Sequence, residues 1–314
     1  MSEVILIGES MGLLNATDYG DLVDVENFKR SVAGAELNVS IGLSRLGHTV
    51  EYVTKIGKDP IGESIVKYLT SENINTEHML FSESHKTGLM LKSRVKQGDP
   101  AIAYYRSHSA FTTFSLEDVN QLEMDSVKLL HITGIPLAIN TSVREALFSL
   151  VKKAKKAGVF ITLDPNLRPS IWESEEQMVK VINEMASYAD VILPGIAEGE
   201  ILTGSSSIED IAQFYLDLGV KVVITKSGEA GAYVSEINKE TENVKGFKVE
   251  QVIDTVGAGD GFAAGIIHGY LSGYSWAKSA KYANAIGALQ VQYVGDNQNL
   301  PTKDKLEAYI ESFN

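Results

Sequence analysis

Short apolar runs alternate with longer segments of helical periodicity along most of this chain. The runs are rich in Val, Ile and Leu, as is typical of strands buried on both faces of a parallel sheet, and they cover residues 4–7, 127–133, 159–163, 191–193 and 220–225. Between them, residues 141–157 and 175–188 have the apolar spacing of amphipathic helices. The alternation predicts βαβ units, and therefore a mostly parallel sheet that helices cover on both sides.

Two stretches interrupt this alternation. Residues 11–32 and 86–109 show short apolar runs with polar punctuation, which predicts strands outside the βα units. In a parallel sheet, ligands bind beyond the carboxyl ends of the strands. Several residues with useful chemistry follow predicted strands, namely those at 164–168, Glu198 and those at 226–228. The sequence thus predicts a ligand site at this edge of the main sheet.

The composition narrows the possible partners. With 314 residues, of which 44% are hydrophobic, the chain can bury a substantial core. A formal charge of −13 and an isoelectric point near 5.0 argue against a nucleic-acid or anionic-membrane surface. The chain has no cysteine, which excludes disulfides, thiolate metal sites and cysteine nucleophiles. With no apolar stretch of membrane-spanning length and no basic leader before the first strand, we expect a cytoplasmic protein.

The most informative run is Asp-Thr-Val-Gly-Ala-Gly-Asp-Gly-Phe at residues 254–262. Its small residues predict a tight turn, and the apolar segment that follows predicts a buried helix. A turn that opens a helix presents unpaired backbone N–H groups and the positive end of the helix dipole, which together bind anions such as phosphate. Asp260 places a carboxylate in the middle of this anion site, beside a bound phosphate, where it can take a proton from a hydroxyl. The turn alone is equally compatible with Asp260 as a solvated helix cap.

Two other phosphate-binding motifs do not fit this chain. The last glycine of G-x-G-x-x-G would fall at Phe262, and no acidic residue ends a strand about twenty positions later. The sequence also contains no G-x-x-x-x-G-K-[ST] run, which excludes a P-loop at the level of the motif. The anion site therefore does not indicate a dinucleotide-binding or a P-loop protein.

Residues 254–266 resemble the C-terminal signature of the ribokinase-like (PfkB) sugar kinases. The N-terminal signature of that family is similar to residues 33–40, Leu46, Gly47 and residues 57–62. The two motifs occur in the family's order and at its usual separation, and the resemblance covers essentially the whole chain. It implies a three-layer α/β/α fold with a mostly parallel central sheet and a small β-sheet lid. The core would comprise residues 1–10, 33–85 and 110–314, and the lid residues 11–32 and 86–109.

The same resemblance implies how the parts would work. The lid would fold over the sugar and take part in contacts between copies of a homo-oligomer. ATP would be the phosphoryl donor, and Asp260 the general base that accepts the proton of the sugar hydroxyl. The backbone amides of Gly257, Ala258 and Gly259 would form the hole for negative charge that develops on the transferred phosphoryl group.

The nucleotide is expected at a second group of residues. Residues 225–231 follow an apolar strand and resemble the family's nucleotide loop, with an ordinary β-turn as the alternative. Asn284, on a predicted small-residue helix, is close to the family's adenine-side position, with a plain helix-surface residue as the alternative. The resemblance implies nucleotide contacts at Asn166, Arg168, Thr225, Lys226, Gly228, Gly231, Gly257, Gly259 and Asn284.

Many members of the family carry an N-x-x-E motif that organises Mg²⁺ and its waters. The corresponding run here is Gly-Ile-Ala-Glu at residues 195–198, which keeps the glutamate and lacks the asparagine. Mg²⁺ holds its waters tightly and is usually bound through substrate phosphates plus one or two carboxylates. Glu198 is therefore expected to act on the metal through a bound water.

Gly34 and Asn38 belong to the N-terminal signature and would serve any sugar. Glycine lets the backbone approach the sugar closely, and an amide offers its hydroxyls both a donor and an acceptor. Discrimination between sugars must come from other residues. Residues 164–169, with Trp172 just after them, resemble the corresponding run of 2-keto-3-deoxygluconate kinases, and some fructokinases carry a close relative of it.

In the predicted lid strand at residues 103–110, Tyr104 and Arg106 point to one face and Tyr105 points to the other. A phenol and a guanidinium on the underside of a lid would suit a carboxylate, since arginine grips one through two parallel hydrogen bonds. Arg106 and Arg168 are thus the expected partners of an acid sugar, with a solvated arginine as the alternative at each position.

Two further details favour an acid sugar. Residues 87–92 look like the lid strand of bacterial 2-keto-3-deoxygluconate kinases, although some relatives place a tyrosine where this chain has Met90. Asp296 lies where those kinases offer a carboxylate to the far hydroxyls of the sugar, with a solvated loop aspartate as the alternative. The resemblance therefore implies an ATP-dependent kinase that phosphorylates a primary hydroxyl of 2-keto-3-deoxygluconate.

Other functions stay open at this point. Within the same fold, the alternatives are a fructokinase or another ribokinase-family kinase. From a different class, the alternative is a sugar-sensing protein that has lost the chemistry, against which the intact run from Gly257 to Asp260 argues. The epimer derived from galactose and a dependence on a monovalent cation are also left open.

Overall fold

The computed structural model describes residues 2–95, 100–293 and 295–313, and its largest element is a sheet of eight strands. These strands are β1 (Val4–Ile7), β4 (Val50–Val53), β9 (Leu129–Thr133), β10 (Phe160–Asp164), β11 (Val191–Ile192), β12 (Val222–Lys226), β13 (Ala232–Glu236) and β14 (Glu242–Val244). Their order is β14-β13-β12-β11-β10-β9-β1-β4. The strands from β4 to β12 in this order are parallel, and β13 and β14 add antiparallel pairs at one edge. All the apolar runs that the sequence predicts as buried strands lie in this sheet.

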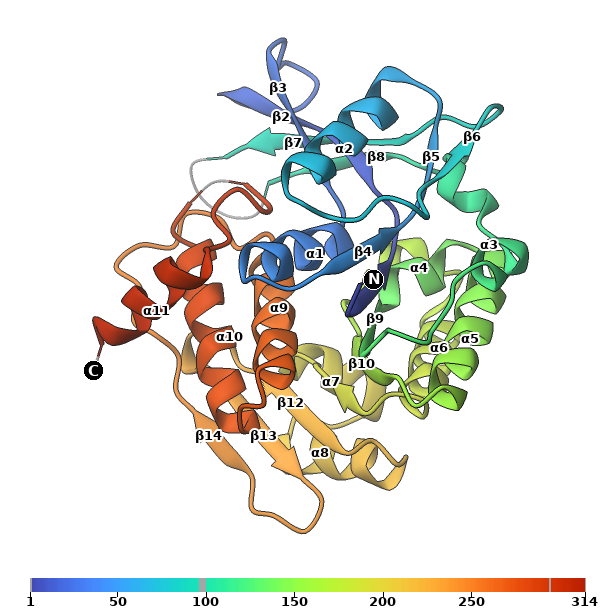
Figure 1. Ribbon diagram of the computed structural model, residues 1–314. Coiled ribbons are helices and arrows are strands. Elements are labelled where there is room, and N and C mark those ends of the chain that lie inside the picture. The colour runs from blue at the N-terminus through green and yellow to red at the C-terminus, as the bar shows by residue number, and fades with distance from the viewer. Residues whose placement is uncertain (1, 96–99, 294, 314) are drawn as a thin grey trace.

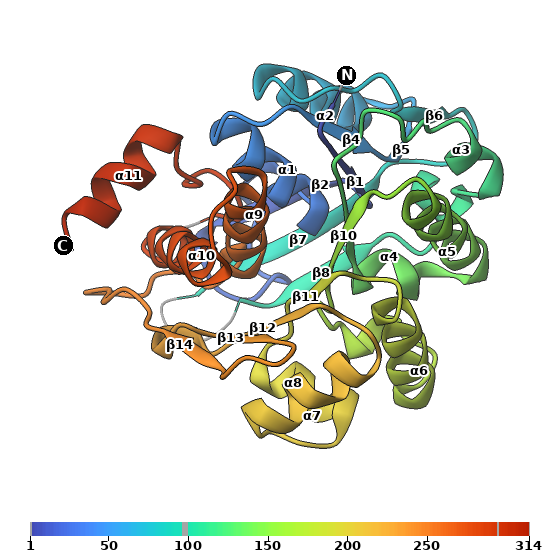
Figure 2. The same ribbon diagram turned by 60° about the horizontal axis from the view of Figure 1, so that its bottom comes forward.

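Helices cover both faces of the main sheet and form two outer layers, as Figures 1 and 2 show. The apolar core on one face includes residues of α1 (Ala35–Arg45), α2 (Pro60–Ser71), α9 (Ala258–Leu271), α10 (Trp276–Gln290) and α11 (Lys303–Glu311). The core on the other face includes residues of α3 (Leu116–Asn120), α4 (Gly134–Ile139), α5 (Thr141–Lys156), α6 (Glu175–Ala186), α7 (Ile196–Thr203) and α8 (Ile208–Asp217). The predicted three-layer α/β/α arrangement is confirmed.

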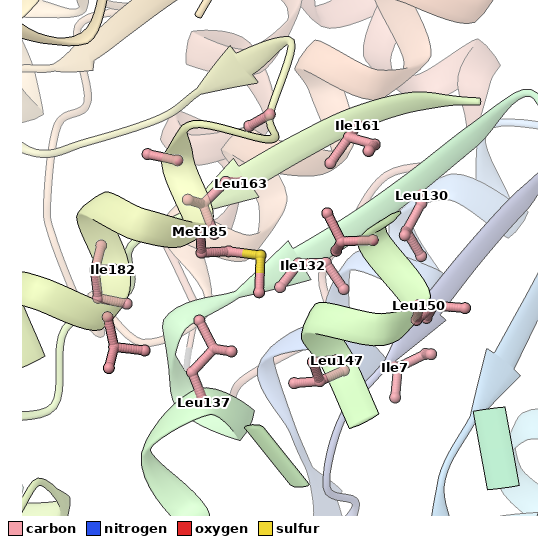
Figure 3. Close-up of a cluster of buried hydrophobic side chains, with 14 of the residues drawn as sticks. Ile7, Leu130, Ile132, Leu137, Leu147, Leu150, Ile161, Leu163, Ile182 and Met185 are labelled. Atoms are coloured by element: carbon pink, nitrogen blue, oxygen red, sulfur yellow. The ribbon is translucent and has the colours of Figure 1, made fainter. Parts of the chain in front are cut away.

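The strands supply side chains to both cores in alternation. In β1, Ile5 and Ile7 pack into the core on the side of α5 and α6, while Val4 and Leu6 pack into the core on the side of α1 and α9. Successive side chains of a strand point to opposite faces, so a strand between two helix layers is apolar throughout. Figure 3 shows part of the core on the side of α5 and α6, where side chains from β1, β9 and β10 lie beside those of the two helices.

Polar side chains determine where the two predicted helices begin. Asn140 accepts a hydrogen bond from the N–H of Val143 (3.0 Å) at the start of α5. Ser174 accepts one from the N–H of Gln177 (3.1 Å) at the start of α6. Such caps satisfy backbone donors that the helix leaves unpaired, and each stabilises a protein by about 1 kcal/mol.

A smaller sheet is built from the two stretches that interrupt the βα alternation. Its strands are β2 (Met11–Tyr19), β3 (Phe28–Ala33), β7 (Gly88–Arg94) and β8 (Ile102–Tyr105), in the order β3-β2-β7-β8. Residues 96–99 of the second stretch lie outside the described residues. This sheet lies at the top of Figure 1, next to α1 and α2, and a separate pair of strands, β5 (Lys55–Gly57) and β6 (Leu80–Ser82), adjoins it. In the described part of the chain, no helix is both long and apolar enough to cross a membrane.

Candidate active site

A cavity of about 310 Å³ opens between the smaller sheet and the carboxyl ends of the main-sheet strands. On one side, side chains of the smaller sheet such as Met90 and Tyr104 line it. On the other side it is lined by the last residues of β10 and β12, Asp164 and Lys226, and by residues at the start of α9. The cavity therefore lies at the edge of the sheet where the sequence predicts a ligand site.

Most of the predicted site residues meet in this cavity. Those that line it are Gly34, Asn38, Met90, Tyr104, Arg106, Asn166, Arg168, Glu198, Lys226, Gly257, Gly259, Asp260 and Asp296. They come from the smaller sheet, from α1, α7 and α9, from the end of β12 and from loops, so the fold joins segments that are far apart in sequence. Their roles toward a ligand stay predictions, which are taken up below.

The remaining predicted residues lie outside the cavity lining. Thr225 is buried within β12, and Gly228 and Gly231 lie in the turn between β12 and β13. The side-chain amide of Asn284 donates to the backbone carbonyls of Val244 (2.9 Å) and Lys245 (3.2 Å). In this structure Asn284 thus ties α10 to the end of β14, and its adenine-side role stays a prediction.

The start of α9 has the geometry of an anion-binding turn. Gly257, the residue before the helix, has a left-handed backbone (φ 78°), and a Cβ atom there would come within 2.0 Å of the carbonyl oxygen of Asp296. Only glycine fits this position. The N–H of Ala258 donates to the carbonyl of Thr255 at 3.3 Å, so this predicted hole amide already has a partner in the turn. Because the first N–H groups of a helix have no acceptor within the helix, the amide of Gly259 is free of the helical ladder.

Asp260 is held by asparagines. Asn38 donates its amide to one carboxylate oxygen of Asp260 at 2.7 Å, and Asn166 donates to the other at 3.4 Å. The orientation of Asn38 is set in turn by Asn297, which donates to its amide oxygen at 2.7 Å. Asn297 is a residue that the sequence analysis missed, since an asparagine in a loop carries no signal of such a contact. The carboxylate of Asp260 thus has a defined position at the centre of the anion-binding turn.

The environment of Asp260 suits a general base. Burial, together with the charge of Asp164, raises the pKa of its carboxyl group to about 7, against the lowering effect of the hydrogen bond from Asn38. A general base is most effective when its pKa lies close to the working pH. At neutral pH this carboxylate can therefore both exist in its basic form and accept a proton.

Replacing Asn38 with leucine is expected to move the acidic limb of the pH profile of kcat/KM upward by about one pH unit. The amide of Asn38 stabilises the charged form of Asp260, so its loss raises the pKa of that carboxyl group. Asn166→Leu is the matched control, because the bond from Asn166 to Asp260 is longer (3.4 Å against 2.7 Å from Asn38). The acidic limb of this variant should therefore shift less. The measurement is kcat/KM between about pH 5.5 and 9, which reports the free enzyme. A limb that stays in place or moves downward would contradict the contact.

Next to Asp260, an ion-pair cluster joins the ends of β10 and β12 to the start of α7. The ammonium group of Lys226 lies 2.8 and 3.0 Å from the two carboxylate oxygens of Asp164, and 3.7 Å from the carboxylate of Glu198. Glu198 also accepts the backbone N–H groups of Gly195 (2.7 Å) and Leu167 (2.8 Å). Burial alone would raise the pKa of Glu198, but Lys226 and these two amides outweigh it, and the pKa is lowered.

This cluster presents two carboxylates and one ammonium group to the cavity. Asp164 was flagged in the sequence only as a residue at a strand end, and it lacked an assigned role. Because Lys226 is held between two carboxylates, its ammonium group has a defined position in the cavity lining.

The two expected arginines differ in their surroundings. Arg168 is exposed at the mouth of the cavity and donates to the carbonyl of Leu167 at 2.8 Å. The guanidinium of Arg106 is instead 2.5 Å from the carboxylate of Glu9, whose side chain is 2% exposed. Arg106 therefore already has a carboxylate partner within the chain, and its role toward a sugar acid stays a prediction. Tyr105 is 64% exposed, while Tyr104 and Arg106 line the cavity, as the alternation predicts. The predicted strand at residues 103–110 is too long, because β8 ends at Tyr105 and a 3-10 helix begins at Ala110.

An anion-binding turn, a buried carboxylate at its centre and an ammonium group held beside it define an enzyme that transfers a phosphoryl group to a small hydroxyl compound. The chain belongs to the pfkB family of carbohydrate kinases, which it matches over residues 1–303. The resemblance that the two sequence motifs indicate is thereby confirmed.

Similar proteins extend this finding over the whole chain. A 2-dehydro-3-deoxygluconokinase of Bacillus subtilis (strain 168) is 41% identical over 311 residues, which are 99% of this chain and 96% of that protein. A crystal structure of a PfkB protein from Polaromonas sp. JS666 superposes with a TM-score of 0.90 at 37% identity and covers 98% of this chain and 100% of the other. A sugar kinase from Pyrococcus horikoshii, solved in complex with ATP, has a TM-score of 0.82 at 29% identity and covers 98% and 99% of the two chains.

Proposed function

We propose that this kinase transfers the γ-phosphoryl group of ATP to a primary hydroxyl of 2-keto-3-deoxygluconate, also called 2-dehydro-3-deoxygluconate. The observation that carries the proposal is the 41% identity, over nearly the full length of both chains, to a kinase named for this substrate. ATP as donor is supported by the ATP complex of the Pyrococcus horikoshii relative. The substrate is an acid sugar, and the cavity contains Arg106 and Arg168, which suit a carboxylate.

The geometry supports a direct route for the reaction. The sugar hydroxyl would lie against Asp260, which accepts its proton while the hydroxyl oxygen attacks the γ-phosphorus and the bond from that phosphorus to the bridging oxygen of ADP breaks. Negative charge on the transferred phosphoryl group would be stabilised by the amides at the start of α9 and by that end of the helix dipole. Lys226, held by Asp164 and Glu198, would contribute a fixed positive charge on the nucleotide side.

Mg²⁺ is proposed to enter the cavity with the nucleotide. Among the described residues, no group of three or more His, Cys, Asp or Glu side chains is arranged to hold a metal ion. Mg²⁺ does not need such a cage, since phosphate oxygens, waters and one or two carboxylates usually suffice. Asp164 and Glu198 are two carboxylates in the cavity lining that fit this requirement. Mg²⁺ would neutralise charge on the phosphates, and Glu198 would contact it through a water.

The remaining cavity residues are assigned to the sugar. Gly34 has an extended, positive-φ backbone (φ 154°), and a Cβ there would meet the carbonyl oxygen of Glu9 at 2.7 Å, so glycine is required for the close approach. Asn38, which donates to Asp260, would also contact the sugar. Met90 and Tyr104 would lie over the sugar from the smaller sheet, and Asp296 would face its far hydroxyls.

We further propose that the smaller sheet is a lid whose outer face joins two copies of the chain. Its inner face lines the cavity, while Tyr105 on the outer face is 64% exposed, and an uncovered sheet face of this kind favours association. Tyr105→Glu is therefore expected to lower the sedimentation coefficient of the purified protein toward that of a monomer. Tyr293→Glu, at a residue 53% exposed and outside the smaller sheet, is the control. A wild type that sediments as a monomer would contradict the oligomer.

The substrate is tested by an ATP-consumption screen over 2-keto-3-deoxygluconate, its galactose-derived epimer, 5-dehydro-2-deoxygluconate, fructose, fructose 6-phosphate, ribose, adenosine and tagatose 6-phosphate. Asp260→Asn protein purified in parallel measures any contaminating kinase. The highest kcat/KM is expected for 2-keto-3-deoxygluconate. A preference for fructose would replace the proposal with a fructokinase, and no turnover of any compound would favour a sugar sensor. Because the donor is ATP, a cytoplasmic location is part of the proposal.

A further inference from the structure

A buried lysine connects the smaller sheet to the anion-binding turn. Lys92 lies in β7, and its side chain is only 5% exposed. Its ammonium group donates to the carboxylate of Asp254 at 2.9 Å and to the carboxylate of Asp296 at 3.2 Å. The two carboxylates are themselves 8% and 5% exposed. Neither the nucleotide nor the sugar roles assigned above make use of this lysine.

Each of the two carboxylates holds a different loop of the site. Asp254 accepts the backbone N–H of Val256 (3.1 Å), at the start of the anion-binding turn, and that of Gly295 (3.3 Å), in the loop before Asp296. Asp296 packs its backbone carbonyl against Gly257, where a Cβ atom would come within 2.0 Å of it. The loop of residues 295–297 therefore packs against the turn, and the ammonium group of Lys92 joins the loop to the turn.

The same loop leads to the general base. Asn297, the residue after Asp296, donates to Asn38, and Asn38 donates to Asp260. A shift of this loop would thus change both the position of the anion-binding amides and the orientation of the group that holds Asp260. In proteins, small displacements of this kind are costly, since a misplacement of about 1 Å can lower a rate roughly a hundredfold.

Two buried carboxylates this close to one ammonium group need its charge. Burial raises the pKa of Asp296, and Lys92 opposes that shift. Among the ion pairs of the described residues, Lys92 is the partner of both Asp254 and Asp296. Removing its charge leaves two like charges in a desolvated place, where they repel each other and separate the two loops.

We infer that Lys92 is a positioning residue that acts as a cation tethered to the lid, and that its ammonium group holds the anion-binding turn and the Asp296 loop in register. The inference rests on the proposed phosphoryl transfer at residues 257–260, and it does not depend on which sugar is the acceptor. It predicts that a small free cation can replace the ammonium group when the lysine side chain is cut back to leave room.

The test compares Lys92→Ala with Lys92→Met, using the sugar that the wild type prefers. Both variants are expected to lose roughly a hundredfold in kcat, with smaller changes in the KM for ATP. Ammonium or potassium chloride, exchanged for tetramethylammonium chloride at constant ionic strength, should restore Lys92→Ala at least about fivefold and in a saturable way. Methionine fills the space of the lysine stem without its charge, so Lys92→Met should not respond. The wild type should change less than about twofold, because its cation is built in.

A matched control separates this effect from the general loss of an ion pair. Lys55→Ala removes a partly buried pair with Asp118 (3.0 Å) outside the cavity lining, and it should neither lose kcat nor respond to ammonium. Should Lys92→Ala fold only when ammonium is present, thermal unfolding will show the rescue directly. Lys92→Met combined with Asp254→Asn keeps the net charge of the cluster and loses the link, so its kcat should stay low in every salt.

Three results would overturn the inference: wild-type kcat in Lys92→Ala without ammonium, equal responses of the alanine and methionine variants, or wild-type kcat in the charge-balanced double variant. These results are distinct from failure of the proposed function. In that case the wild type itself turns over no sugar, and ammonium-dependent thermal stability of Lys92→Ala against Lys92→Met still tests the cation site.

Discussion

Asp260→Asn is expected to lower kcat by roughly two to four orders of magnitude while ATP and sugar affinities stay within a few-fold of the wild type. Asparagine keeps the shape of the side chain and cannot accept the proton of the sugar hydroxyl. Its single amide oxygen can accept from Asn38, which makes the shorter bond, while the weaker contact with Asn166 is lost. Burial raises the pKa of Asp260 to about 7, so the ionised carboxylate lowers the free energy of unfolding as the pH rises. The variant should therefore be at least as stable as the wild type above neutral pH.

Steady-state kinetics with calorimetric titration of ATP and sugar would separate loss of chemistry from loss of binding. Asp304→Asn is the matched control, since Asp304 also lies in the first turn of a helix, α11, but on an exposed surface. It should keep wild-type turnover. Near wild-type kcat in folded Asp260→Asn protein would remove Asp260 from the mechanism.

The second large effect concerns the substrate. Arg106→Ala and Arg168→Ala are each expected to cut kcat/KM for 2-keto-3-deoxygluconate roughly a hundredfold or more, because the carboxylate of the sugar loses a guanidinium partner. Activity on fructose, which has no carboxylate, should fall much less. General damage to the fold would lower both activities alike, so the ratio of the two kcat/KM values is the measurement. A parallel loss of both would contradict the acid-sugar assignment.

The contact between Arg106 and Glu9 demands a further control. Arg106→Ala leaves the buried carboxylate of Glu9 without its cation, which by itself could disturb the cavity. The double variant Glu9→Gln with Arg106→Gln removes both charges and leaves no unpaired ion. If Arg106 meets the sugar acid, this double variant stays impaired on 2-keto-3-deoxygluconate and recovers on fructose. Recovery on both sugars would show that Arg106 acts only through Glu9.

Local sequence patterns predicted much of the architecture. The continuous apolar run at residues 4–7 predicts a strand covered on both faces, because each successive side chain needs a separate apolar layer, and both layers are present. The polar punctuation of residues 11–32 predicts strands outside the βα pattern, and these form β2 and β3 of the smaller sheet. The edge strands β13 and β14, which pair in an antiparallel way, were not predicted, because they lie outside the βα alternation.

The candidate site was only partly predictable for a different reason. Asp260 and the glycines around it carry a signal within nine residues, since a tight turn and a helix start need particular local residues. Asn297 carries none, because its role depends on Asn38, which is 259 positions away. Arg106 was expected to meet a sugar acid, and its partner within the chain could not be predicted because Glu9 lies far away in sequence, between β1 and β2.

The sequence by itself determined the α/β class, the family and the glycine turn that places Asp260 at the start of α9, because each depends on periodicity or on a short run of residues whose backbone needs are local. Only the tertiary structure decided that Arg106 is paired with Glu9 and that Lys92 joins Asp254 to Asp296. Such pairs form when segments distant in the chain are desolvated together, and burial then makes each charge require a partner that the linear order of residues does not reveal.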